Sequence, residues 1–298
     1  MARQHCYAAS SAFAAAALAI FTGGAAFAAD PAPGAMSALE KNDVSAVVIL
    51  LGQTESGGLQ ALCTATAFEK DGKTYRFVTA AHCVADDDVA HERVAVAQTN
   101  WYVTFDERGS KKFYPAKIIA VGYQHLGDDF TVLEVEMDRE IPIIPLANAD
   151  GVRGEEIVNV AAPLGLGKQL FRGHVSLDVL DRPIIEGAIN WRGANLLQVN
   201  VGPGSSGSAV VSKTRGSIIA ILVGNISARS SPNVVAIPVS KFQKFYKDTA
   251  TKKYRYYKGD GLDYLSGKSP TVMGLLHKEY LRYGVEPPLD PMTLPNVP

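Results

Sequence analysis

Three kinds of feature are scarce in this chain of 298 residues, and each scarcity excludes a class of protein. Its formal net charge is −1, from 29 basic and 30 acidic side chains, so no charge excess favours a nucleic acid or a membrane surface as partner. Beyond residue 29, no apolar run is long enough to span a bilayer. His, Cys, Asp and Glu nowhere show the spacing of a metal site, so we expect no metal and no cofactor.

The N-terminal segment, by contrast, has the organisation of an export signal. Arg3 supplies a positive charge, residues 11–29 form an Ala-rich uncharged run, and the Ala-Phe-Ala sequence ending at Ala28 offers the small residues that a signal peptidase needs. A membrane anchor is the alternative, but a run dominated by Ala and Gly is weakly hydrophobic and short for a span. The pattern predicts a signal peptide over residues 1–28, and a secreted or periplasmic protein without stable membrane insertion after cleavage.

Cysteine occurs three times, and Cys6 would be removed with the signal peptide. Cys63 and Cys83 then remain as a single pair in an oxidising compartment, where a disulfide persists. A bridge that closes a loop of this size contributes on the order of 3 kcal/mol to stability. We therefore expect a Cys63–Cys83 disulfide, and two buried free thiols are the alternative.

The rest of the chain is a series of short runs rich in Val, Ile, Thr and aromatic residues, separated by Gly, Asp, Asn and Pro. Many short strands at this spacing, with few helical patterns between them, indicate a sandwich or barrels. Only the end of the chain has helical periodicity, at residues 239–246 and 270–283, on either side of a Lys- and Tyr-rich linker. The predicted strands cover residues 46–51, 61–68, 75–80, 94–96, 101–105, 116–123, 131–135, 156–161, 170–175, 184–190, 196–199, 208–211, 217–223 and 234–237.

Three local patterns carry chemistry, in the order His, Asp, Ser. His82 follows a β-type run, Asp129 opens an apolar strand, and Ser206 lies in a Gly-rich turn. Serine attack on a carbonyl needs a base, a group that orients the base, and donors for the developing oxyanion. His82 suits the first task and Asp129 the second, while the bent backbone of the turn lets the amides of Gly204 and Ser206 point into one pocket. Each pattern alone is weak, but their joint occurrence predicts a serine hydrolase.

The Thr-Ala-Ala-His-Cys sequence that ends at Cys83, with Cys63 upstream, resembles the histidine signature of trypsin-like serine proteases. The second half of the chain resembles the bacterial high-temperature-requirement (Deg-type) branch of that family. The segments that carry this second resemblance are Gly154-Glu155-Glu156-Ile157, Ala162-Pro163-Leu164-Gly165-Leu166, Gly173-His174-Val175-Ser176, Pro203-Gly204-Ser205-Ser206-Gly207 and Ala236-Ile237-Pro238.

The resemblance covers about residues 44–244 and implies an all-β fold of two six-stranded antiparallel β-barrels, with the His82–Asp129–Ser206 triad in the cleft between them. It also implies an exported serine endopeptidase that hydrolyses protein or peptide substrates through an acyl-enzyme. The expected domains are an N-terminal lead-in (29–43), a first barrel (about 44–145), a second barrel (about 150–247) and a short, helical C-terminal extension (248–298). About fifty residues follow the barrels, so we expect no PDZ domain.

The chain departs from the family pattern in two places. Ser205 stands where digestive enzymes carry an Asp that pairs with a newly cut N-terminus, and serine cannot form that ion pair. Ser208 replaces the second glycine of the commonest motif. Activation through a new N-terminus is therefore not expected.

The substrate pocket is bounded by fewer clues. Asn200 lies six residues before Ser206, where an acid would select Arg or Lys, and no Asp or Glu lies in residues 196–206. The strand expected to wall the pocket contains Leu222, Val223 and Gly224 and carries no cation, which disfavours acidic substrates as well. The residues favour a small or apolar side chain at the cleaved position.

Several alternatives stay open. Asp128 competes with Asp129, but strand alternation sends adjacent side chains to opposite faces, and the family register selects Asp129. His125 and His174 fit no role in the triad. A different hydrolase, such as an esterase, is possible, although an α/β-hydrolase would place its serine before the histidine and acid. A catalytically silent, protease-like peptide-binding protein is the main alternative function.

Overall fold

The computed structural model describes residues 37–54, 56–88, 93–97, 99–105, 112–124, 127–180, 185–186, 189–225 and 233–250. The predicted signal peptide, His125 and the predicted helix at 270–283 lie outside the described residues. No helix in these ranges is long and apolar enough to cross a membrane.

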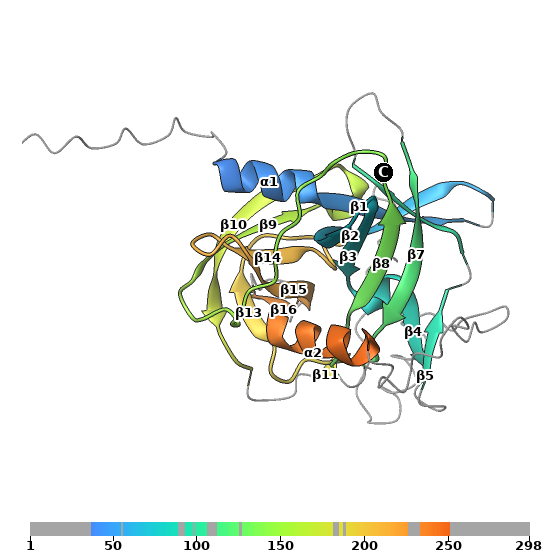
Figure 1. Ribbon diagram of the computed structural model, residues 1–298. Helices are drawn as coiled ribbons and strands as arrows, with labels where there is room; N and C mark the ends of the chain where they lie inside the picture. The colour runs from blue at the N-terminus through green and yellow to red at the C-terminus, as the bar shows by residue number, and fades with distance from the viewer. Residues whose placement is uncertain are drawn as a thin grey trace, which may run out of the picture. The chain divides into compact units, whose positions relative to one another are not determined.

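Six antiparallel strands close the first barrel in the order β1-β2-β3-β8-β7-β6 (Figure 1). Strand β1 is apolar on both faces because one face packs in the main core and the other packs on the second barrel. Its residues Val48 and Leu50 point into the main core, whereas Val47, Ile49 and Leu51 pack against residues of the second barrel. The strands are β1 (Val47–Gln53), β2 (Leu59–Asp71), β3 (Thr74–Thr79), β6 (Trp101–Thr104), β7 (Tyr114–Val121) and β8 (Thr131–Glu136).

The second barrel is also closed and antiparallel, in the order β10-β13-β16-β15-β14-β9. The two closed barrels confirm the predicted all-β, trypsin-like fold class, and closure leaves neither barrel with an open edge. The strands are β9 (Glu156–Ala161), β10 (Gln169–Leu177), β13 (Asn195–Gln198), β14 (Ala209–Ser212), β15 (Ile218–Asn225) and β16 (Asn233–Pro238).

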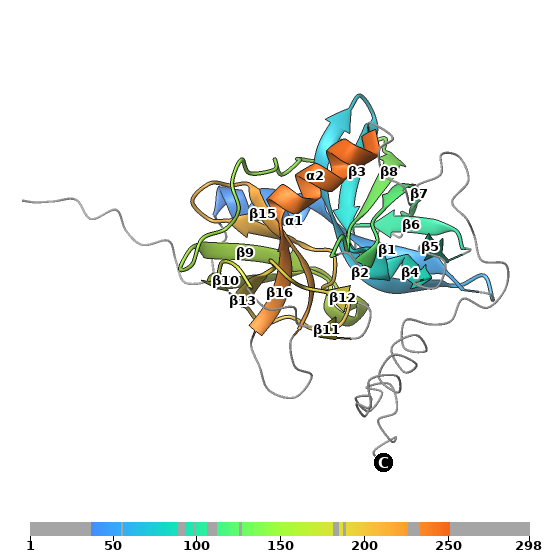
Figure 2. The same cartoon turned by 90° about the horizontal axis from the view of Figure 1, so that it is seen from below.

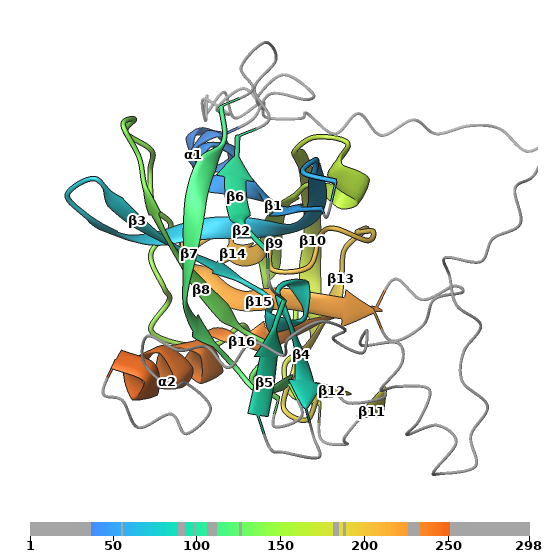
Figure 3. The ribbon, with the colours of Figure 1, turned by 90° about the vertical axis from the view of Figure 1, so that its right-hand side faces the viewer.

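Two hairpins stand outside the barrels, and Figure 3 shows the first of them, β4 (Ala85–Asp88) with β5 (Arg93–Val96). Residues 85–88 were not expected to form a strand, because three consecutive aspartates have low β-propensity. The single strand predicted at 184–190 is instead a pair of two-residue strands, β11 (Ile185–Glu186) and β12 (Ile189–Asn190). Two short 3-10 turns, η1 (Ala81–Cys83) and η4 (Pro163–Gly165), lie beside the candidate site.

Helix α1 (Ala38–Ala46) occupies part of the segment that we expected to be a lead-in. Ser37 and Glu40 cap it reciprocally: the Ser37 Oγ accepts from the Glu40 amide, and the Glu40 carboxylate accepts from the Ser37 amide. Glu40 also pairs with Arg172 of β10, with 2.7 Å between Oε1 and Nε. The Lys168 Nζ donates to the Val44 carbonyl at the end of the helix. These contacts fix α1 on the second barrel.

Helix α2 (Val239–Ala250) confirms the helix predicted at 239–246 and continues beyond it. It follows β16 directly and crosses to the β3–β8 side of the first barrel (Figure 2). There the ring of Phe242 packs edge-on against Phe68 and Phe130, with centroids 5.2 and 5.3 Å away. Tyr246 donates to Glu69 and accepts from Arg76, so the helix joins the two barrels by polar contacts as well.

Asp43 of α1 is a buried acid without a partner. Its side chain is 1% exposed, and neither carboxylate oxygen has a hydrogen-bond partner within the described ranges. Burial raises the pKa of Asp43 from 3.8 to about 7, and the charge of Glu40 acts in the same direction. The folded state therefore binds more protons than the unfolded chain between about pH 4 and pH 7. The contribution of Asp43 to the free energy of unfolding is therefore fully present below about pH 4 and is lost as the pH rises to about 7.

The variant Asp43→Asn tests this statement. Because it cannot ionise, it should gain free energy of unfolding relative to the parent as the pH rises from 4 to 8, by on the order of a few kcal/mol. Urea unfolding of both proteins at pH 4, 6 and 8 measures the difference. If the difference in free energy of unfolding between the two proteins were the same at all three pH values, Asp43 would not have a raised pKa.

Candidate active site

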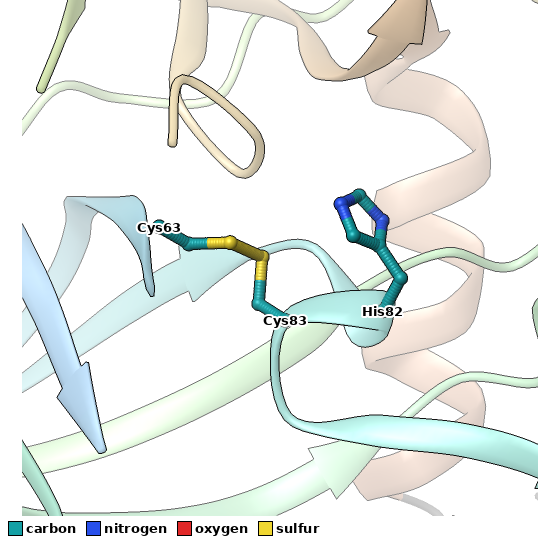
Figure 4. A group of neighbouring side chains, drawn as sticks. All are labelled: Cys63, His82 and Cys83. Carbon is teal, nitrogen blue, oxygen red and sulfur yellow. A yellow bond between two sulfur atoms is a disulfide. The ribbon is translucent and has the colours of Figure 1, made fainter. Parts of the chain in front are cut away.

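His82 and Cys83 are neighbours on the turn η1, and the disulfide from Cys83 reaches Cys63 of β2 (Figure 4). The two Cα atoms are 6.1 Å apart and the cysteines are 20 positions apart. One ligand atom of His82 lies within 4.8 Å of both sulfur atoms, but these sulfurs are bonded to each other and offer no thiolate for a metal. The bridge ties the histidine turn to β2.

His82 is held at two points by Asp129. The Nδ1 atom of its ring lies 2.7 Å from Oδ2 of Asp129, and its backbone amide donates to Oδ1 at 2.9 Å. The Asp129 side chain is fully buried, whereas the His82 side chain is 21% exposed. With Nδ1–H donating to the carboxylate, the Nε2 atom is left as a proton acceptor on the exposed side of the pair.

Four effects set the pKa of His82. Burial lowers it, while the charge of Asp129, the hydrogen bond to Asp129 and the charge of Asp86 raise it. The raising effects prevail, so the pKa of His82 lies above its ordinary 6.5. Asp86 belongs to β4, the strand that the sequence did not indicate.

The two adjacent acids have different environments. Asp129 contacts His82, whereas Asp128 is half-buried and its charge acts on Lys241 and Lys244 of α2. The segment is fixed by Gly122, whose amide donates to the Phe130 carbonyl, and a Cβ atom at position 122 would clash with the Asp128 carbonyl. The structure thus brings Asp129, and not Asp128, to the histidine.

Most backbone N–H and C=O groups of the turn that carries Ser206 form hydrogen bonds. The carbonyls of Pro203 and Ser206 accept from the amides of Leu164 (2.7 Å) and Thr64 (3.0 Å). The amides of Gly204 and Ser206, by contrast, have no acceptor within the part of the chain that the structure describes. They are the two donors predicted from the sequence.

Two residues of this turn must be glycine. Gly204 has φ +90° and Gly207 has φ +83°, in the left-handed region that side chains disfavour. A Cβ atom at position 207 would lie 2.5 Å from the Thr64 carbonyl oxygen and 2.7 Å from the Ala80 amide nitrogen. The turn of the second barrel is therefore in backbone contact with the segment that leads to His82.

The two departures from the family motif have local partners. The Ser205 side chain is fully buried, and its Oγ accepts weakly from the Gly202 amide, at 3.4 Å. The Oγ of Ser208 accepts from Nδ2 of Asn159 at 2.8 Å, within the second barrel. Both serines thus serve the packing of the turn without an ion pair.

The predicted pocket residues differ in how exposed their side chains are. Leu222 and Val223 are 2% and 3% exposed and belong to the core, while Asn200 is exposed. At Gly224, a Cβ atom would lie 3.1 Å from Cζ2 of Trp191, so the indole packs directly on the glycine. Trp191 is 3% exposed, and its Nε1 atom has no hydrogen-bond partner among the described residues. His174 is exposed on β10, where it pairs with Gln198 of β13.

Sequence reasoning missed Thr64, Asp86, Leu164 and Trp191. Only the first had a visible signal, since Thr64 follows the bridged Cys63 directly. Leu164 stands in a segment that carried the family resemblance, and Asp86 lies four residues after His82, but no local pattern indicated what these two residues or Trp191 contact.

Comparison with known proteins finds relatives among serine proteases. A serine protease HtrA-like protein of Staphylococcus aureus (strain USA300) is 28% identical over 196 residues, which covers 62% of this chain and 23% of the relative. The corresponding protein of strain COL shows the same values. The chain thus spans about a quarter of the length of the curated relatives it matches.

Two solved structures share the fold. A serine endoprotease from Yersinia pestis has a TM-score of 0.53 at 17% identity, covering 74% of this chain and 69% of that one. The HtrA-type protease AlgW, solved with a tripeptide, has a TM-score of 0.55 at 19% identity, covering 72% and 63%. Such identities establish the fold alone.

Residues 63–221, just over half of the sequence, match the family described as the trypsin-like peptidase domain. The resemblance found in the sequence is thereby confirmed, and the chain belongs to the trypsin-like peptidase domain family.

Proposed function

We propose that the protein is an exported serine endopeptidase that cleaves protein or peptide substrates with His82, Asp129 and Ser206. The observation that carries the proposal is the buried Asp129 carboxylate at 2.7 Å from Nδ1 of His82. Ser206 lies in a turn that contacts Thr64 and the backbone of Ala80, and the amides of Gly204 and Ser206 have no acceptor among the described residues. Family membership and the shared fold support the same reaction class.

The residues divide the reaction between them. The Ser206 hydroxyl attacks the carbonyl carbon, and its proton passes to Nε2 of His82, which Asp129 holds in the correct tautomer. The amides of Gly204 and Ser206 donate to the oxyanion that forms. His82 then gives the proton to the departing amine, and an acyl-enzyme remains. Water, activated by the same imidazole, attacks the ester and releases Ser206.

Export rests on the N-terminal segment, whose features suit a cleaved signal. The Cys63–Cys83 disulfide is consistent with it, because such bridges persist in oxidising compartments. The proposed location is the periplasm or the exterior of the cell.

Covalent labelling tests the nucleophile. Intact-mass spectrometry after exposure to a fluorophosphonate probe should show one adduct on the wild type and none on Ser206→Ala or His82→Ala, because attack on phosphorus needs both the hydroxyl and the base. Ser208→Ala, which removes a neighbouring buried hydroxyl, should still be labelled.

A folded, oxidised wild type without an adduct would contradict the proposal. It would favour the silent peptide-binding protein, in which the same cleft holds peptides without cutting them. Circular dichroism of each variant confirms that loss of labelling does not reflect unfolding.

The pH dependence tests the environment of His82. Because only the neutral imidazole accepts the proton, kcat/KM should fall on the acid side, with a midpoint above pH 6.5. Removing a negative charge that raises this pKa, in Asp86→Asn, should move the midpoint to lower pH. Asp71→Asn, at the exposed end of β2, makes the same charge change as a control. Equal midpoints in Asp86→Asn and the wild type would rule out the contribution of Asp86.

We further propose that the enzyme prefers a small or apolar side chain at the cleaved position. The packing of Trp191 on Gly224 and the buried Leu222 and Val223 support a pocket of limited depth without charge. Mass-spectrometric profiling of a peptide library should give cleavage mainly after Ala, Val or similar residues. A profile dominated by basic or acidic residues would contradict this preference.

A further inference from the structure

Thr64 of β2 is a fully buried residue that belongs to the first barrel but hydrogen-bonds mainly outside it. Its amide donates to the Ser206 carbonyl at 3.0 Å. Its hydroxyl donates to the Gly204 carbonyl at 2.8 Å and accepts from the Ala162 amide at 2.9 Å. Its carbonyl accepts from the Thr79 hydroxyl at 2.8 Å. One residue thus contacts the serine turn twice and also the segments before η1 and η4.

The direction of the Thr64 hydroxyl is fixed. The Ala162 amide can only donate, so the hydroxyl oxygen accepts there and its single hydrogen goes to the Gly204 carbonyl. The Gly204–Ser205 peptide is held at its other side as well, because the Ser205 amide donates to the Gly202 carbonyl at 3.0 Å. This peptide plane therefore has one orientation.

The Pro203–Gly204 peptide, which carries the Gly204 amide, is also held in one orientation. In a trans peptide the carbonyl and the N–H point in opposite directions. The Pro203 carbonyl accepts from Leu164, which lies two residues after Ala162 in the segment that the Thr64 hydroxyl holds. The Gly204 N–H consequently faces away from Leu164, without an acceptor in the described chain.

We propose that Thr64 is a positioning residue for the oxyanion donors: its hydroxyl, bonded to the Gly204 carbonyl and the Ala162 amide, fixes the direction of the Gly204 amide. This role rests on the proposed function, in which the Gly204 and Ser206 amides meet the oxyanion. Without the hydroxyl, the partly buried Gly204 carbonyl loses its donor, and the buried Ala162 amide loses its acceptor. The segment whose Leu164 amide holds the Pro203 carbonyl then loses its tie to Thr64, and the Pro203–Gly204 peptide, which carries the Gly204 N–H, can rotate because the glycine at φ +90° resists little.

The experiment compares Thr64→Val, Thr64→Ser and Thr66→Val. Valine keeps the shape of threonine and removes the hydroxyl, while serine keeps the hydroxyl. Thr66 is the matched control, because it is equally buried on the same strand and its Oγ1 accepts from the Ala209 amide at 3.2 Å, outside the serine turn. Urea unfolding of the two valine variants checks that they lose comparable stability.

We expect Thr64→Val to lose on the order of ten- to one-hundred-fold in kcat, somewhat less than the loss of an oxyanion donor itself. KM and the acid-side midpoint of the pH profile should not change, since the hydroxyl contacts neither the substrate pocket nor His82. Affinity for a peptide boronic acid, whose tetrahedral adduct places an oxygen at the oxyanion position, should fall with kcat. Thr64→Ser should recover most of both losses, and Thr66→Val should stay within about twofold of the wild type.

Equal losses in Thr64→Val and Thr66→Val, or no recovery in Thr64→Ser, would overturn the positioning role. A ¹H–¹⁵N correlation spectrum of each protein provides a readout that does not need activity: the Gly204 amide signal should move in Thr64→Val and not in Thr66→Val. An inactive wild type would count against the proposed function alone. An unmoved Gly204 signal in Thr64→Val would count against the role of Thr64.

Discussion

The contact between the two barrels is the constraint on which the site depends. Its apolar part is the outer face of β1, where Val47 packs with Val158 and Val160, and Ile49 and Leu51 pack with Ala162. Its polar part consists of backbone groups that lose water where the barrels meet and must find partners there. The apolar contacts favour association of the two barrels without fixing their orientation. The hydrogen bonds form only when the two barrels have one relative alignment. Only in that alignment does the Ser206 turn of the second barrel lie against Thr64 and the segment that leads to His82.

The Cys63–Cys83 disulfide joins two segments of the first barrel that lie at this contact. Cys63 lies directly before Thr64, and Cys83 lies directly after His82, so the bridge joins the strand that holds the serine turn to the turn that presents the base. This covalent link thus fixes, within the first barrel, the turn that carries His82 relative to the strand that the serine turn contacts. The glycines at 204 and 207 supply the opposite property, since they permit a backbone path that other residues resist.

The sequence predicted the fold class because strand residues recur at short intervals, and it predicted the chemistry because the histidine, acid and serine each have a local motif. Helix α1 was missed although Ser37 and Glu40 form a capping-box pattern, because Lys41, Asn42 and Asp43 give it no clear apolar face. Strand β4 was missed because its pairing with β5 outweighs the low β-propensity of aspartate. Asp86 could not be placed because its position follows from the unexpected strand β4, and Trp191 could not because its contact with Gly224 joins separate segments.

Helix α2 has a consequence for the order in which the molecule is completed. Its Tyr246 meets Glu69, a partner 177 positions earlier, and its Phe242 and Phe245 cover Phe130, the residue next to Asp129. A chain that grows from its N-terminus therefore leaves Phe130, the apolar neighbour of Asp129, without this cover until nearly all of the second barrel has been made. The last described helix covers this part of the first barrel, so a nascent chain that already contains His82, Asp129 and Ser206 still lacks the packing that supports Asp129.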